Sequence, residues 1–99
     1  MTTFAIVGDL MDRARIDEAI LDVHHTTAGR IGALAGPDDL ILVDLRRLGE
    51  QVKLAVATGA RVVGFAPHVD DELLAAGHAA GCEVLPRSLF FRRLATGSF

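Results

Sequence analysis

The sequence contains no tryptophan, no tyrosine and a single cysteine, Cys82. One cysteine excludes an internal disulfide, so we expect a reducing, cytoplasmic location. Long apolar runs are also missing, because charged residues, glycine and histidine interrupt each one before the roughly 20 residues that span a membrane. The first ten residues have no basic segment ahead of their apolar stretch, which argues against a signal peptide. We therefore expect a soluble protein with no membrane partner.

An excess of positive charge is missing as well. The chain carries 10 lysine and arginine residues against 13 aspartate and glutamate residues, which gives a formal net charge of -3. This composition provides no broad basic field that would attract a phosphate backbone. We therefore expect no binding to nucleic acid.

The length and apolar content of the chain suit one folded unit. With 99 residues, 51% of them hydrophobic, the chain has enough material for one buried core and no room for a second. No linker, internal repeat or low-complexity tract interrupts it. We expect a single domain over residues 1–99.

Short apolar runs predict the strands of a sheet. The clearest is LILVDL, which follows the polar pair Asp38-Asp39 and is broken by Asp44 near its end. Similar runs at 4–7, 61–66 and 83–85 also have the length of buried strands. Residues 21–27 alternate only weakly and favour a short edge strand.

Apolar residues at helical spacing fill the intervals between these strands. We expect helices from Leu10 to about Ile20, over 28–35, 50–58 and 69–80, and after Ser88. The expected N-caps are Asp9 or Asp12 for the first helix, Asp70 for the fourth, with Val69 packed against Leu74, and Ser88 for the last. The expected stop signals are Gly36-Pro37, Gly59 and Gly81.

The alternation of strands and helices over short connections favours a parallel sheet with helices on both faces, a three-layer α/β fold. In such sheets functional groups gather beyond the carboxyl ends of the strands. Four residues follow predicted strands directly or closely, namely Asp9, Asp44, Pro67 and Arg87. We expect these four to lie on one rim of the sheet.

Three segments of the chain resemble a known family. They are Gly8-Asp9 after the first predicted strand, PDDLILVDL at 37–45, and AAGCEVLPRSLF at 79–90. Together they resemble the receiver domain of two-component response regulators over nearly the whole chain. The resemblance implies a flavodoxin-like fold, with a five-stranded parallel sheet of order 2-1-3-4-5 and helices on both faces.

The resemblance also implies roles for residues at the rim. Asp44 is the candidate phosphoacceptor, and Asp9 with Asp44 would hold Mg²⁺. Arg87 stands where receivers have a lysine, and Ala66 stands where they have a threonine or serine that contacts the phosphoryl group. These two departures indicate a degenerate phosphorylation site, because each alters a group that would receive the developing phosphoryl charge.

A second resemblance concerns proteins without an output domain. LMDRARI at 10–16, GFAPHVDDELL at 64–74 and LPRSLFFRRL at 85–94 resemble a group of small stand-alone receiver-like proteins of bacteria. This likeness implies that the chain acts as a module by itself. It does not indicate a signal or a pathway partner.

Two interpretations of Asp44 remain open. In one, its carboxylate is a nucleophile that takes a phosphoryl group with Mg²⁺. In the other, Asp44 forms a structural ion pair with Arg87 or Arg46.

Other residue types give weaker indications. The spacing of His24-His25, of 68–71 and of His78 does not favour a zinc site, because these side chains would point in different directions. No glycine-rich phosphate-binding loop follows the first strand, so we expect no nucleotide cofactor. Cys82 has no general base near it in the sequence and is expected to pack as a small apolar residue.

Phe90 and Phe91 are neighbours in the last predicted helix, so their rings cannot point in the same direction. We expect one ring to meet solvent or a partner, as part of a dimer or effector interface. The alternative is that the terminal helix shields both rings within the chain.

The features favour a stand-alone pseudo-receiver, meaning a non-enzymatic signalling or protein-interaction module that is homodimeric or bound to a protein partner and needs no cofactor. One alternative is a phosphorylatable single-domain response regulator that uses Asp44 with Mg²⁺. Another is a flavodoxin-like protein that binds a small anionic ligand through Arg46, Arg47 and Arg87.

Overall fold

The structure is a computed structural model that describes residues 1–97 and 99. Its strands are β1 (Thr3–Ile6), β2 (His24–His25), β3 (Leu40–Asp44), β4 (Arg61–Ala66) and β5 (Glu83–Pro86). Its helices are α1 (Leu10–Ala19), α2 (Ala28–Leu34), α3 (Leu45–Leu48), the 3₁₀ helix η1 (Gly49–Gln51), α4 (Val52–Val56), α5 (Asp71–Ala79) and α6 (Arg87–Thr96).

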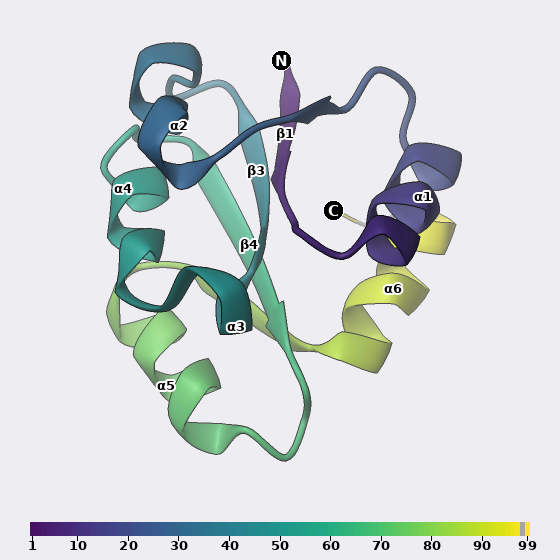
Figure 1. Ribbon diagram of the computed structural model, residues 1–99, viewed down its shortest axis with the longest axis vertical. Helices are drawn as coiled ribbons and strands as arrows, with labels where there is room; N and C mark the ends of the chain where they lie inside the picture. The colour runs from purple at the N-terminus through teal and green to yellow at the C-terminus, as the bar shows by residue number, and fades with distance from the viewer. Residues whose placement is uncertain (98) are drawn as a thin grey trace.

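The five strands form one parallel sheet of order β2-β1-β3-β4-β5. In Figure 1 the sheet runs down the middle, with α2 to α5 on one side and α1 with α6 on the other. The predicted three-layer α/β, flavodoxin-like fold is therefore confirmed. In the described part of the chain, no helix combines the length and the apolar character that crossing a membrane requires.

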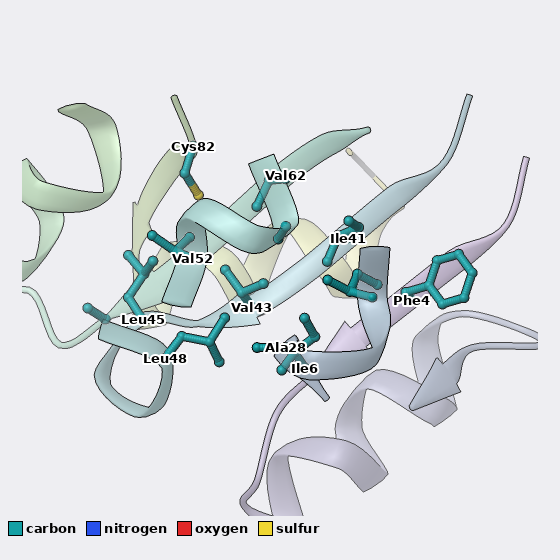
Figure 2. Close-up of a cluster of buried hydrophobic side chains, with 13 residues drawn as sticks. Phe4, Ile6, Ala28, Ile41, Val43, Leu45, Leu48, Val52, Val62 and Cys82 are labelled. Atoms are coloured by element: carbon teal, nitrogen blue, oxygen red, sulfur yellow. The ribbon is translucent and has the colours of Figure 1, made fainter. Parts of the chain in front are cut away.

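Two apolar cores lie on opposite faces of the sheet. Along β3, Ile41 and Val43 face the core under α2 to α5, whereas Leu40 and Leu42 face the core under α1 and α6. This alternation follows from the two-residue period of a strand, and it explains why the run is apolar at successive positions. Figure 2 shows the first core, in which side chains from the helices meet those of the strands.

The connection after β3 differs from the prediction. We expected one helix over 50–58, whereas the chain becomes helical at Leu45 and continues through α3, η1 and α4. The side chain of Asp44 explains the early start, because its Oδ1 atom accepts a hydrogen bond from the Arg46 N–H (3.0 Å) and caps α3. Gly49, with a φ of 54°, ends α3 and begins η1.

Two predicted helix starts were wrong in detail. Asp70 caps α5 as expected, with its side chain accepting from the Leu73 N–H (3.3 Å), but Val69 is 77% exposed, so the expected packing against Leu74 does not bury it. The last helix begins at Arg87 rather than after Ser88. Its N-cap residue is Pro86, which makes no side-chain capping bond.

Asp39 ties the amino terminus to the entrance of β3. Its Oδ1 atom accepts from the Thr2 N–H and its Oδ2 atom from the Gly36 N–H, both at 2.9 Å. The hydrogen bonds from Gly36 and Thr2 lower the pKa of the Asp39 carboxyl below its ordinary value. A lowered acid pKa means that this carboxylate stabilises the fold at neutral pH and loses that effect as the pH falls.

We expect Asp39→Asn to flatten the loss of stability on acidification. Between about pH 5 and pH 3, the urea midpoint of the wild-type protein should fall more steeply than that of the variant. Asp38→Asn, a change at the exposed neighbouring residue, is the matched control and should keep the wild-type slope. Equal slopes in wild type and Asp39→Asn would contradict the prediction.

Candidate functional site

A pocket of about 520 Å³ lies at the carboxyl edge of the sheet, which is the lower end of the sheet in Figure 1. The structure brings together in it all four residues that were predicted to share a rim. The lining comprises Gly8, Asp9, Asp12, Asp44, Arg46, Arg47, Phe65, Pro67 and Arg87. Three acids and three arginines therefore meet at the ends of four strands.

Asp9 is positioned by the start of α1. As the N-cap residue, it accepts hydrogen bonds at Oδ1 from the backbone N–H groups of Met11 (2.9 Å) and Asp12 (3.0 Å). The carboxylate thus satisfies two donors that a helix start leaves unpaired. Asp9 lines the pocket, but one of its two oxygens already serves the helix.

Asp12 and Arg87 form the central contact of the pocket. Asp12 is only 3% exposed, and the Arg87 guanidinium donates from Nη1 to Oδ2 (2.7 Å) and from Nη2 to Oδ1. The hydrogen bonds to Asp12, together with the nearby charges of Asp44 and Asp9, raise the pKa of Arg87. The guanidinium carbon also lies 4.8 Å from the centre of the Phe91 ring, a distance typical of a cation–π contact.

This geometry corrects the expected ion pair of Asp44. Arg87 binds Asp12, which lies 75 residues away in the chain, and Asp44 makes no ion pair within residues 1–97 and 99. The half-buried Asp44 instead caps α3 through the backbone N–H of Arg46. The helical start directly after β3 is the reason, because it brings that N–H within reach of the carboxylate.

The end of β4 offers no hydroxyl group to the pocket. Ala66 is fully buried and pairs with Pro86 of β5. The two residues on either side of it, Phe65 and Pro67, line the pocket and lack side-chain hydrogen-bond donors. A phosphoryl group at Asp44 would therefore find no side-chain donor at this strand end.

The predicted Mg²⁺ ligands, Asp9 and Asp44, both line the pocket. In the part of the chain that the structure describes, no group of three or more His, Cys, Asp and Glu side chains is disposed to hold a metal ion. Asp9 and Asp44 each use one oxygen as a helix cap, and both oxygens of Asp12 bind Arg87. A hard cation that took Asp12 as an additional ligand would have to displace the guanidinium.

Arg46 and Arg47 are the remaining cations of the pocket. Both are exposed, and neither side chain makes a hydrogen bond or an ion pair with another described residue. The guanidinium of Arg47 lies over Gly8, where a Cβ atom would be 2.5 Å from its Cζ atom. The absence of a side chain at Gly8 therefore lets Arg47 reach across to the end of β1.

The expected interface at Phe90 and Phe91 was wrong. The two rings are 0% and 4% exposed, so the alternative that α6 shields both within the chain is what the structure shows. Phe90 packs against Phe65 of β4 with ring centres 4.4 Å apart, and Phe91 is covered by Arg15 of α1 at 4.0 Å. Because α6 lies in the corner between the sheet and α1, neighbouring positions can face two different buried surfaces.

The histidines and the cysteine form no site. Among residues 1–97 and 99, His25 is the one histidine in an ion pair, with its Nε2 atom 2.7 Å from Asp17 Oδ1. Cys82 is buried beneath α4 and donates its thiol to the Glu83 carbonyl (3.1 Å). Burial raises the pKa of this thiol to about 11, so it stays protonated and unreactive at neutral pH.

The role of Asp12 was only partly visible in the sequence. Asp12 is three residues after the cap Asp9, a spacing that returns to the same side of a helix. This spacing is the signal that could have placed Asp12 in the pocket.

Comparison with protein-family models, with curated proteins and with solved structures finds no match to the chain.

Proposed function

We propose that the chain is a stand-alone receiver-like module of the bacterial cytoplasm that acts in signalling through protein contacts and does not transfer phosphoryl groups. The ion pair between Arg87 and Asp12 supports the proposal most directly. In the receiver family that the sequence resembles, acids after the first strand hold a cation and a lysine after the last strand contacts the phosphoryl group. Here Arg87, which stands in the lysine's position, binds Asp12. The positive charge beside this acid therefore comes from a side chain of the protein.

The energetics of this contact favour a fixed structural role. A nearly buried carboxylate without a partner is unfavourable by several kcal/mol, and a two-bond contact with guanidinium is among the strongest that proteins form. Mg²⁺ would have to break that contact to gain Asp12 as a ligand. The charge of Asp12 is therefore balanced by a side chain of the same protein, which fits a module that does not depend on phosphorylation.

One observation favours the alternative, a phosphorylatable response regulator. Asp44 lies in the pocket, and its Oδ2 atom has no hydrogen-bond partner in the described chain. A carboxylate oxygen of this kind is the nucleophile that phosphotransfer needs. The missing hydroxyl at Ala66 and the occupied Asp12 oppose this alternative.

Intact-mass spectrometry separates the two functions. The protein is incubated with acetyl phosphate, with and without Mg²⁺, and we expect no added mass in the folded wild-type protein. Arg87→Lys, which restores the residue of receivers, and Asp44→Asn are measured beside it. One added phosphoryl group that requires both Mg²⁺ and Asp44 would overturn the proposal and establish a working response regulator.

The proposed partner surface consists of exposed apolar side chains that follow the pocket residues Asp9 and Pro67 in the sequence. Leu10, Met11 and Val69 follow β1 and β4 and are 75%, 78% and 77% exposed. Burying each such side chain on association stabilises a complex by roughly 1.5 to 3 kcal/mol. We propose a second copy of the chain as the partner. Light scattering over a range of concentrations should show a dimer that Met11→Ser weakens, and a monomer at high concentration would contradict the proposal.

A further inference from the structure

A second pocket, of about 700 Å³, lies beside the first. It is formed by the end of β1, the segment between β2 and α2, and residues of α3 and η1. Its side-chain hydrogen-bond donors come from Arg13, Thr26, Thr27, Arg47 and Gln51, and its remaining lining is glycine and apolar residues. Arg47 and Gly8 line both pockets and separate them.

The second pocket borders the switch point of the sheet, beside the end of β1. The chain leaves β1 through α1 to reach β2 on one side, and it returns through α2 to β3 on the other side of β1. Parallel α/β sheets bind ligands beyond the carboxyl ends of their strands at this reversal. A volume of about 700 Å³ is in the range of pockets for small molecules.

The charge of the lining is of one sign. Two guanidinium groups line the pocket, and no carboxylate does. The first pocket differs, because its acids Asp9, Asp12 and Asp44 offset its arginines. An anion is therefore favoured in the second pocket and is not favoured in the first.

Both guanidinium groups are available to a ligand. Arg13 is half-buried and is held by one hydrogen bond, from Nε to the Val7 carbonyl (2.7 Å), which leaves its two terminal nitrogens without a partner in the described chain. Arg47 has no hydrogen-bond or ion-pair partner among residues 1–97 and 99. The hydrogen bond to Val7 orients Arg13 in advance, so less freedom is lost when an anion binds.

Two threonines, Thr26 and Thr27, also line the pocket. The Thr26 N–H donates to the Ala5 carbonyl (3.0 Å), which holds Thr26 and Thr27 beside the end of β1. Thr27 begins α2 without a side-chain capping bond, so its hydroxyl remains unused by the helix. The lining thus offers threonine hydroxyls in addition to the two guanidinium groups.

We propose that this pocket binds the phosphate group of a small molecule. Arg13 and Arg47 bind its oxygens through charge-assisted hydrogen bonds, and the threonine hydroxyls bind the oxygen that remains. Guanidinium groups match phosphate geometry with two parallel bonds each, and two of them balance a dianion. Because the pocket is much larger than a phosphate ion, an organic group attached to the phosphate has room beside it.

Calorimetric titration at constant ionic strength tests the proposal, with inorganic phosphate and glucose 6-phosphate as probes. We expect both probes to bind the wild-type protein. Arg47→Gln should weaken binding by about tenfold or more, since a hydrogen bond to a charged group is lost. Arg46→Gln, in the first pocket, and Arg92→Gln, on the exposed side of α6, are the matched controls and should retain the wild-type affinity.

Two further variants, Arg13→Gln and Gly8→Ala, test the same pocket. Arg13→Gln should also weaken binding, but it removes the bond to Val7 and has to be shown to be folded. Gly8→Ala places a methyl group where the Arg47 guanidinium lies, so the flexible end of Arg47 moves away. It should reduce phosphate affinity with little change in thermal stability.

The outcomes decide both the site and the source of the phosphate. Tighter binding of glucose 6-phosphate than of inorganic phosphate would support a phosphorylated small molecule, and equal affinity would support free phosphate. No heat of binding for either probe, or an equal loss in Arg46→Gln and Arg47→Gln, would overturn the proposal. The Asp44 phosphorylation assay is independent of these measurements.

Discussion

Replacement of Arg87 by methionine is expected to lower the free energy of unfolding by about 2 to 4 kcal/mol. Methionine keeps an unbranched apolar stem but leaves the Asp12 carboxylate, 3% exposed, without its partner. The expected loss is below that of a fully buried pair, because the Arg87 side chain is 41% exposed and water can reach the vacated site. Urea denaturation at pH 7 measures the effect.

Two comparisons make this prediction specific to the ion pair. Arg92→Met, on the exposed side of the same helix, should change stability by no more than about 0.5 kcal/mol. The double variant Asp12→Asn with Arg87→Met should lose less than the sum of the single changes, because no unpaired charge then remains. Equal losses in Arg87→Met and Arg92→Met would mean that the ion pair does not form in solution.

Phe90→Ala is expected to cost about 3 to 5 kcal/mol, which is a large share of the roughly 5 to 15 kcal/mol that stabilise a domain. Phe90 is 0% exposed, and its ring centre lies within 5.1 Å of those of Phe65, Phe91 and Phe99. Truncation leaves a cavity among aromatic rings that cannot collapse fully. Thermal or urea unfolding measures the loss.

Leu21→Ala is the control for Phe90→Ala, because Leu21 is 89% exposed and its truncation should change stability by no more than about 0.5 kcal/mol. The prediction also separates a core residue from an interface residue. A small loss of stability accompanied by a change in oligomeric state would contradict the buried position of Phe90 and restore an interface role.

The strands and the rim of the sheet followed from local sequence. Apolar runs such as 40–45 are readable because a strand buried on both faces needs apolar side chains at successive positions. Asp9, Asp44, Pro67 and Arg87 could be placed on one edge because all parallel strands end there. That argument needs only the order of elements along the chain.

The hydrogen-bond and ion-pair partners of the rim residues did not follow from the local sequence. One of the two interpretations of Asp44 was an ion pair with Arg87 or Arg46, but the early start of α3 gives Asp44 a backbone donor. The packing of α1 against α6 brings Arg87 to Asp12 instead. Helix starts and side-chain reach depend on single residues, and the local pattern does not specify them.

The sequence by itself determined the layered α/β fold and the edge of the sheet at which its polar residues collect. These properties depend on the local periodicity of apolar residues, which is clear in segments such as 40–45 and weak in 21–27. Only the tertiary structure decided which charges neutralise each other, that Phe90 and Phe91 are both covered, and that Arg13 and Arg47 share a pocket without an acid. These outcomes depend on distances between residues far apart in the chain, which arise when the helices pack against the sheet.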